Sequence, residues 1–375
     1  MMEPLVSIIE QNEDELNFKL SNVNVSIANS IRRVILSEIP IIVFRTTPYE
    51  KNNLDIITNT SRMNNELIKQ RFSCIPIHIN DLNFPKEDYI VELNVINNEE
   101  KMIYVTTENF KIKNIKNKTY LNSNESKKIF PPNSITNNFI DIINLRPKIS
   151  DDILGEEINI NAKFDIGMAK EDSAFNVVST CCFSNTLDKI KINDEWNKKL
   201  KELTNNNDID KEEIENLKND WYNLDAKRIF IKDSFNFKIE TIGQYDNNTI
   251  VIKACDIMIN KIEKFNQDLQ SKNYLINESN NTIDNCYDIT LENEDYTLGK
   301  VIEIILYNTF YKHPKNNPSG ILSFCSFNKI HPHDSNSTIT IAFTDKNNTN
   351  NVIEILTNVC DKSIEIYKKI ASNFK

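Results

Sequence analysis

Residues 29–40, NSIRRVILSEIP, continue a helical pattern that begins near residue 25. Apolar residues recur at three- and four-residue spacing, which is typical of an amphipathic helix with one buried face. They are Ile27, Ile31, Val34, Ile35 and Leu36. Ser26 is the predicted N-cap and Pro40 the predicted stop. The apolar face of this helix therefore belongs in a core.

Arg32 and Arg33 stand next to each other in this otherwise apolar segment. Burying one large apolar side chain stabilises a fold by roughly 1.5 to 3 kcal/mol, whereas an exposed arginine contributes about 0 to 1 kcal/mol. The fold thus gains little from the two arginines. Two interpretations stay open at this point: a solvated helix face, or a face that docks another protein.

Length and charge restrict the class of protein. A chain of 375 residues is long enough for two or three domains. Its formal net charge of -10 argues against non-specific binding of nucleic acid, which requires a positive surface. The N-terminal sequence lacks a basic and apolar signal segment, and no apolar run approaches the length of a membrane span. We therefore expect a soluble, intracellular protein that has no membrane partner.

The sequence shows no pattern for a metal or a reaction. Seven cysteines without any C-x-x-C pair predict reduced thiols and no zinc site. The HPH at residues 331–333 has no nearby cluster of carboxylates or cysteines at ligand spacing. Phosphate-binding glycine loops, nucleophile elbows and dinucleotide motifs are missing from the sequence. We therefore predict no catalytic residue, no metal and no cofactor.

Patterning predicts an α+β fold. Alternating strand-like segments surround the first helix, short strands dominate the middle, and charged helical segments with tryptophans follow. The predicted parts are a first, discontinuous domain at 1–45 and 186–270 with a helical hairpin at 190–228, a strand-rich insert domain at 46–185, a polar linker at 271–282, and a second, small domain at 283–375.

An internal repeat links the two ends of the chain. VSIANSIRRVIL at 25–36 aligns with YTLGKVIEIILY at 296–307, and Thr297 takes the place of the Ser26 cap. Glu303 and Ile304 stand where the first copy has its arginines. Two similar α+β units in one chain predict a pseudo-symmetric pair, with helix packed against helix. The predicted dimerisation interface consists of Ile27, Ile31, Val34, Ile35, Leu298, Ile302, Ile305, Leu306, Val359 and Ile366.

These motifs resemble a known family. NVSIANSIRRVILSEIP at 24–40 and NTSRMNNELIKQRFSCIPI at 59–77 are similar to the signature of the alpha-like assembly subunits of cellular RNA polymerases. The similarity continues at DIGMAKEDSAFNVVSTCCF, residues 165–183, and at residues 237–258. The C-terminal unit resembles the small alpha-like partner subunit through EDYTLGKVIEIIL at 294–306 and the IHP that begins at Ile330.

The resemblance implies a fusion of the third-largest-subunit homologue with its small partner, two dimerisation domains paired within one chain, and a source among large DNA viruses of eukaryotes. That source would place the protein in the host cytoplasm, at the viral factory, and allow packaging in the virion. The sequence departs from the family in three ways. The loop at 106–128 lacks the cysteines of a zinc or iron-sulfur site, and Asn65 and Gln70 replace an acidic residue and a histidine. A bacterial-type DNA-binding domain is also missing, so no sequence-specific DNA binding is expected.

The implied function is a non-catalytic scaffold of a DNA-directed RNA polymerase. It would hold the second-largest and largest subunits, together with small zinc-binding subunits. The residues predicted to dock these partners are Asn29, Arg32, Arg33, Glu66 and Arg71. A local salt bridge is the alternative role for Arg71. A polymerase-independent adaptor and a stand-alone enzyme with an unfamiliar site remain as alternative functions.

Overall fold

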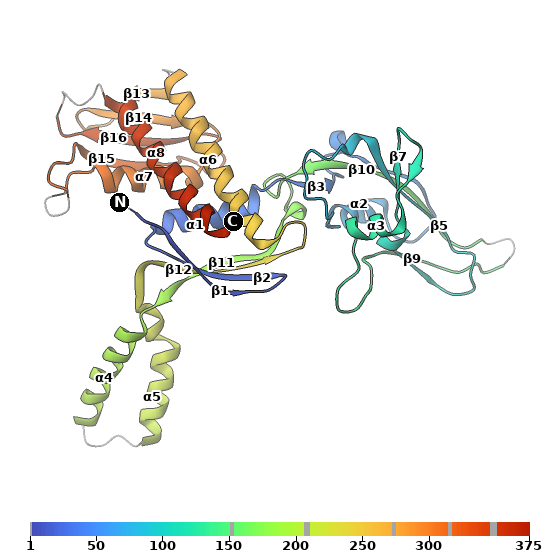
Figure 1. The fold of residues 1–375 in the computed structure, drawn as a ribbon, viewed down its shortest axis with the longest axis horizontal. Helices are drawn as coiled ribbons and strands as arrows, with labels where there is room; N and C mark the ends of the chain where they lie inside the picture. Colours follow the sequence, from blue (N-terminus) through green and yellow to red (C-terminus); the bar gives the residue numbers. More distant parts are fainter. Residues whose placement is uncertain (1, 151–153, 206–210, 272–274, 314–316, 346–350) are drawn as a thin grey trace. The chain divides into compact units, whose positions relative to one another are not determined.

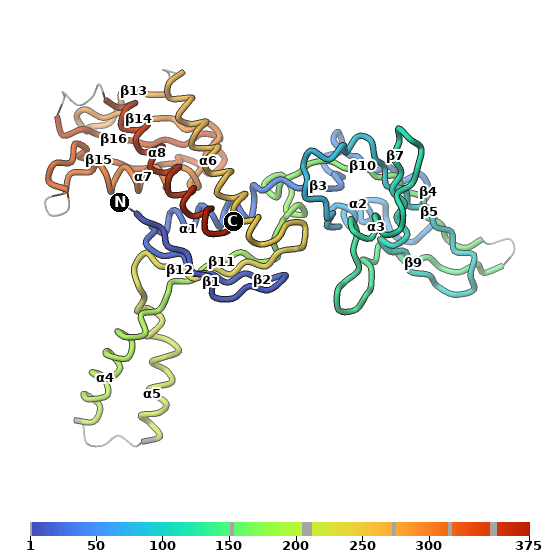
Figure 2. The backbone as a smooth tube through the Cα atoms, in the orientation of Figure 1, coloured from blue at the N-terminus to red at the C-terminus, as the bar shows by residue number. Residues whose placement is uncertain are grey.

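The computed structural model describes residues 2–150, 154–205, 211–271, 275–313, 317–345 and 351–375. The chain forms a mixed α/β structure with two compact units, traced in Figures 1 and 2. Unit 1 consists of Met1–Val34, Thr180–Ile239 and Val251–Lys375, and unit 2 of Ile35–Ser179 and Glu240–Ile250. Each unit is described by itself.

Unit 1 contains two four-stranded sheets. The strands of the first sheet are, in spatial order, β1 (Leu5–Gln11), β2 (Glu15–Ser21), β12 (Phe230–Thr241) and β11 (Val178–Leu187). Helices α1 (Val25–Ser37) and α6 (Asn247–Ser271) accompany this sheet, and we call these elements the first half. The buried ring of Phe18 on β2 stacks on Phe237 of β12 at 4.9 Å between centroids.

A pair of helices lies between β11 and β12 in the sequence. They are α4 (Lys189–Asn205) and α5 (Lys211–Asn223), and the residues between them lie outside the described part of the chain. The rings of Trp196 and Trp221 face each other at 6.3 Å between centroids. Leu224 follows the last residue of α5 and is 67% exposed.

The second sheet belongs to the C-terminal part of unit 1. Its strands are, in spatial order, β13 (Ile276–Glu278), β14 (Cys286–Leu291), β16 (Ser337–Phe343) and β15 (Leu322–Asn328). Helices α7 (Tyr296–Phe310) and α8 (Val352–Ala371) complete this second half. Thr357 of α8 donates a hydrogen bond to Asn266 of α6 at 3.1 Å, which agrees with the neighbouring course of these helices in Figure 1.

The predicted linker at 271–282 differs from the structure. Residues 272–274 lie outside the described residues, but Ile276–Glu278 form β13, which pairs antiparallel with β14. A polar edge strand is held by its backbone hydrogen bonds, so composition alone made it resemble a linker. The second sheet therefore begins before residue 283.

Unit 2 is rich in strands. Its main sheet has the order β3 (Ile41–Phe44), β10 (Glu157–Gly167), β5 (Tyr89–Ile96), β7 (Lys111–Asn114) and β8 (Thr119–Tyr120), with β4 (Leu54–Asn59) also paired to β10. A second ladder joins β6 (Ile103–Thr106) to β9 (Asp141–Leu145). The helices are α2 (Asn65–Ser73) and α3 (Ser123–Ile129).

The boundary predicted at residue 45 is wrong for β3. This strand was assigned to the first domain, but it pairs antiparallel with the Phe164–Gly167 end of β10 in unit 2. All four of its residues are buried, and Phe44 joins Phe72, Phe110 and Phe164 in the core of the unit. A continuous apolar strand is typical of a strand whose two faces are both covered, and the burial of all four residues shows this for β3, although it is the terminal strand of the sheet.

Candidate subunit interface

The capping residue of helix α1 lies two residues before the predicted one, and the helix begins at Val25. Asn24, and not Ser26, is the capping residue, because its side-chain oxygen accepts a hydrogen bond from the Ser26 N–H at 2.9 Å. The second copy of the repeat has the same arrangement. Asp295 caps α7 by accepting from the Thr297 N–H at 2.8 Å, so Thr297 is not the cap. Both helices therefore start with an Asx residue, and the hydroxyl side chain two positions later is free for another contact.

The residues predicted for the dimerisation interface are all buried. Their exposed fractions range from 0% to 6% in the chain as folded. The buried set comprises Ile27, Ile31, Val34, Ile35, Leu298, Ile302, Ile305, Leu306, Val359 and Ile366. Burial alone does not separate an interface between the halves from the core of each half.

A buried hydrogen bond joins the first half to the second. The Ser30 hydroxyl on α1 lies 2.5 Å from the Tyr367 hydroxyl on α8. Ser30 also donates to the Ile27 carbonyl at 2.7 Å, so its single proton is used and Tyr367 is the donor to Ser30. Burial raises the pKa of Tyr367, and the bond to Ser30 opposes that shift. The sequence analysis identified neither residue as part of the interface.

Arg33 makes a further polar link between the halves, beside the Thr357–Asn266 hydrogen bond and an ion pair of Lys261 on α6 with Glu294 at 2.9 Å. Its Nη2 lies 2.7 Å from Asp295 Oδ2, and its Nε donates to Thr297 Oγ1 at 2.8 Å. One guanidinium thus holds both the capping residue of α7 and the hydroxyl of the first turn. The side chains of Arg33 and Asp295 are 38% and 29% exposed, so water screens the pair in part. Arg33 was predicted to contact another subunit, but its partners here belong to its own chain.

Arg32 has a different environment from Arg33. Its Nε and Nη2 both donate to the side-chain oxygen of Asn29, at 3.1 and 2.7 Å, one turn earlier on the same helix. Residues one position apart on a helix point about 100° apart, so Arg32 and Arg33 cannot share one narrow contact. Burial raises the pKa of Cys181 to about 12, and the positive charge of Arg32 opposes the shift. Asn29 therefore holds the Arg32 guanidinium on its own helix.

The other predicted docking residues lie on α2 of unit 2. Glu66 stands in the first turn with a side chain that is 77% exposed and a loose ion pair to Lys69 at 3.7 Å. Arg71 is exposed and donates to the Asp141 carbonyl on β9 at 2.8 Å, which replaces the salt bridge considered for it. Leu67 on the same helix is 54% exposed. The structure thus presents α2 with an accessible face of mixed polarity.

A buried arginine in unit 2 was missed by the sequence analysis. Arg45 donates from Nε to Asp165 at 2.7 Å and from Nη2 to Glu171 at 2.8 Å and to the Ile166 carbonyl at 2.6 Å. Its side chain is only 8% exposed and its guanidinium lies over the Phe175 ring at 5.6 Å. Asp165, Glu171 and Phe175 all belong to the DIGMAKEDSAF motif. The motif therefore has a structural role in this unit.

The described residues include no group of three or more histidines, cysteines or carboxylates placed to hold a metal ion. None of the described helices combines the length and the apolar character required to cross a bilayer.

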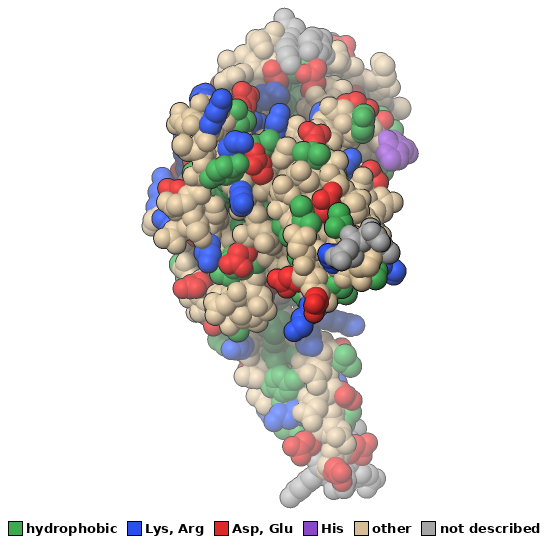
Figure 3. Space-filling view, turned by 90° about the vertical axis from the view of Figure 1, so that its right-hand side faces the viewer, with side chains coloured by type: hydrophobic (Ala, Val, Ile, Leu, Met, Phe, Trp, Pro, Cys, Tyr) green, Lys and Arg blue, Asp and Glu red, His purple; other side chains and the backbone are tan. Residues whose placement is uncertain are grey.

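On the face of the molecule shown in Figure 3, lysines and arginines are interspersed with acidic side chains and form no continuous basic patch. Binding of a polyanion requires clustered positive charge, which this face does not offer.

Comparison with known proteins gives the family. Residues 17–262 match the RNA polymerase Rpb3/Rpb11 dimerisation domain family. The chain is 25% identical over 285 residues to DNA-directed RNA polymerase subunit Rpo3 of Pyrococcus furiosus, which covers 71% of this chain and 97% of the relative. It is 23% identical over 314 residues to the RPAC1 subunit of DNA-directed RNA polymerases I and III of Mus musculus, covering 71% and 84%.

A shorter stretch of 74 residues is 38% identical to subunit 3B of DNA-directed RNA polymerases IV and V of Arabidopsis thaliana, covering 20% of this chain and 21% of the relative. These relatives are alpha-like subunits of RNA polymerases. The family match spans well over half of the chain and includes α1 with its buried face and polar links. This chain therefore belongs to the RNA polymerase Rpb3/Rpb11 dimerisation domain family.

Proposed function

We propose that this chain is a non-catalytic assembly subunit of a DNA-directed RNA polymerase, in which the two halves of unit 1 form an intramolecular pseudo-dimer. One observation carries the proposal. Arg33 of the first repeat helix binds the cap Asp295 of the second repeat helix at 2.7 Å, across two halves that each contain a repeat helix, a four-stranded sheet and a second long helix. Such a pair is the arrangement expected of two alpha-like units in one chain.

The proposed pseudo-dimer is a platform for the second-largest and largest polymerase subunits, with small zinc-binding subunits beside them. We assign docking to Arg32 with Asn29, and to Glu66 and Arg71 on α2. Support for Arg32 comes from its two hydrogen bonds to Asn29, which fix the guanidinium without a partner elsewhere among the described residues. A preorganised arginine is typical of the residues that dominate binding energy at protein interfaces.

The proposal includes a fusion of the third-largest-subunit homologue with its small partner. The family match ends at residue 262. The assignment of the second half as an alpha-like unit is therefore supported by the internal repeat, by its own four-stranded sheet and by the cap of α7. We further propose a large DNA virus of eukaryotes as the source and the host cytoplasm as the site of action, with packaging in the virion included. The resemblance of the sequence to a fused pair of alpha-like polymerase subunits supports the proposed source and the proposed site of action.

The test is a purification of the affinity-tagged full chain from cells that contain its polymerase, with co-purifying chains identified by mass spectrometry. We expect the two largest polymerase subunits in stoichiometric amounts. Arg32→Glu should reduce their recovery at least tenfold, because truncating an arginine at an interface centre costs about 2 kcal/mol and charge reversal adds repulsion. Arg228→Glu is the matched control, since the Arg228 side chain is 85% exposed and, within the described part of the chain, its ion pair is the loose one to Asp225 at 3.7 Å.

The alternatives give different results in the same experiment. A polymerase-independent adaptor would return other proteins and no large polymerase subunit. A stand-alone enzyme would likewise return no large polymerase subunit, and the purified chain would turn over nucleotides in a separate assay. Normal recovery with Arg32→Glu would leave the assembly role intact and refute the docking role of Arg32.

A further inference from the structure

The two repeat helices have counterpart positions that can be compared one by one. Both helices follow an Asx cap, and the cap side chain accepts from the N–H two residues later in each case. The caps confirm the alignment of 25–36 with 296–307, in which Ser26 matches Thr297. The counterparts are then Asn24 and Asp295, Ser30 and Val301, and Arg33 and Ile304.

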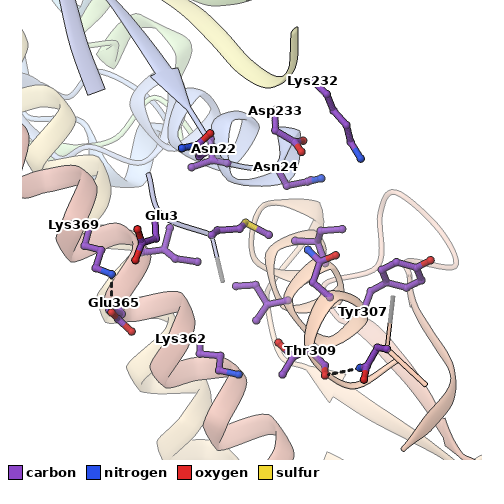
Figure 4. A pocket seen from close by; sticks show the side chains of 17 residues that line it. Glu3, Asn22, Asn24, Lys232, Asp233, Tyr307, Thr309, Lys362, Glu365 and Lys369 are labelled. Atoms are coloured by element: carbon purple, nitrogen blue, oxygen red, sulfur yellow. Dashed lines mark hydrogen bonds and ion pairs between the residues drawn. The ribbon is translucent and has the colours of Figure 1, made fainter. Parts of the chain in front are cut away.

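The clamp formed by Arg33 exists at only one of two counterpart positions. Arg33 reaches the cap of α7, as described above. At the other position, Ile304 of α7 and the cap Asn24 of α1 line an open cavity of about 1200 Å³. Figure 4 shows Asn24 at one side of this cavity and Tyr307 of α7 at the other. An isoleucine is too short and too apolar to make the mirror-related clamp, so the pair of halves is asymmetric here.

The buried hydroxyl link is asymmetric in the same way. Ser30 accepts a hydrogen bond from Tyr367, whereas its counterpart Val301 is fully buried and has no polar side-chain atom. A second half that faced another second half would place Tyr367 against Val301. The buried hydroxyl would then have no acceptor at that position, which is costly in a core.

We propose that the Arg33 clamp and the Ser30–Tyr367 bond select the pairing of unlike halves over the pairing of like halves from two copies of the chain. This inference rests on the intramolecular pseudo-dimer of the proposed function. In a pair of two second halves, Asp295 would face Ile304 in place of Arg33. In a pair of two first halves, Arg33 would face the neutral Asn24. Each lost polar link disfavours the like pair by about fivefold to a hundredfold in the pairing equilibrium.

The covalent connection between the halves also favours the unlike pair. A short tether gives an effective concentration in the millimolar range. At about 1 μM chain the tether alone favours the intramolecular pair by roughly a thousandfold, but at about 100 μM only by roughly tenfold. The polar links therefore have a measurable effect when the chain refolds at high concentration. A domain-swapped dimer contains the same unlike interface, so its proportion does not depend on Arg33.

The test uses the full chain, refolded from denaturant at about 10 and 100 μM and analysed by size-exclusion chromatography with light scattering. Arg33→Asp places two carboxylates together in the unlike pair and an aspartate beside Asn24 in the like pair. We expect the ratio of dimer to monomer at the higher concentration to rise at least tenfold. Arg33→Ile, which copies Ile304, should give a smaller rise. The swap Arg33→Asp with Asp295→Arg should restore the monomer.

Arg32→Asp is the matched control, because Arg32 binds only Asn29 on its own helix among the contacts described for it. The inference would be overturned if Arg33→Asp and Arg33→Ile were both monomeric at both concentrations. It would also be overturned if Arg32→Asp raised the ratio of dimer to monomer as much as Arg33→Asp does. If Arg33→Asp fails to fold, Arg33→Ile and the charge swap decide the question. Recovery of polymerase subunits is measured separately, so a failure of the pairing inference is distinguishable from a failure of the proposed function.

Discussion

Replacement of Arg45 by methionine should destabilise unit 2 more than the same replacement of an exposed arginine would. Methionine keeps much of the length of the side chain but removes the guanidinium. Three hydrogen bonds are lost, to the Asp165 and Glu171 carboxylates and to the Ile166 carbonyl, at 2.7, 2.8 and 2.6 Å. The contact of the cation with the Phe175 ring is lost as well.

The magnitude follows from what remains after the change. Removing one partner of a buried ion pair costs about 3 to 5 kcal/mol when the other charge is left uncompensated. Here Asp165 keeps a hydrogen bond from Lys86 at 2.8 Å, and Glu171 is 42% exposed and can be solvated. We therefore expect a loss of about 2 to 3 kcal/mol in the free energy of unfolding of unit 2.

Hydrogen exchange with mass spectrometry suits this measurement because it reports on each unit separately. The free energy of opening is read from peptides of β10, which contains Asp165. Arg71→Met is the control, since exposed Arg71 makes one hydrogen bond to a backbone carbonyl and should cost under about 1 kcal/mol. The reasoning is refuted if Arg45→Met changes β10 protection by less than about 0.5 kcal/mol, or no more than Arg71→Met does.

The same ion pair predicts a pH dependence. Burial opposes ionisation of Asp165, but hydrogen bonds from Lys86 and Arg45 hold its pKa below the usual value. A carboxyl with a lowered pKa in the folded state contributes stability above its unfolded-state pKa of about 3.9 and loses it as the pH falls through the folded-state pKa. The difference in β10 protection between wild type and Arg45→Met should therefore narrow below about pH 4.

Three further predictions concern unit 1. Ser30→Val should cost about 2 kcal/mol in urea unfolding because it leaves the Tyr367 proton without an acceptor, whereas Tyr367→Phe should cost about 1 kcal/mol; the reverse order would contradict the assigned donor. Gly299→Ala should lower the melting temperature by several degrees, since the new Cβ would lie 2.0 Å from the Phe327 ring, and an unchanged melting temperature would contradict this contact. A specific protease site inserted after Ser271 should be cleavable while the fragments still co-elute at micromolar concentration; separate monomers would contradict an obligate pair of halves.

The sequence was sufficient to predict helix α1, and Ile27, Ile31, Val34 and Ile35 of its predicted apolar face are all buried. The two caps were each placed two residues too late, at Ser26 and Thr297. A hydroxyl in the first turn resembles a cap, but an Asx side chain two positions earlier provides the acceptor in both helices. The error left the side chain of Thr297 without a role, and the structure supplies one as an acceptor for Arg33.

Other features could not be predicted because they depend on distant residues. Arg33 and Asp295 are 262 positions apart, and no local pattern connects them. Strand β13 has a polar sequence and exists because β14 offers a free edge for backbone pairing. Arg45 stands just after a buried apolar strand, where its charge appears unfavourable until Asp165 and Glu171 are brought beside it by the fold.

The two adjacent arginines of α1 illustrate why composition alone could not assign a function to each. Neighbouring positions on a helix point in directions about 100° apart, so the two arginine side chains lie on different sides of α1. Arg33 forms an ion pair with Asp295, the cap of α7. Substitution of Arg33 should therefore change the pairing of the halves in the isolated chain. Arg32 is held by Asn29 on its own helix, so its loss should leave that pairing unchanged. A defect of Arg32 that appears only when polymerase subunits are present would assign the docking surface to one side of α1, with the intramolecular interface on the other.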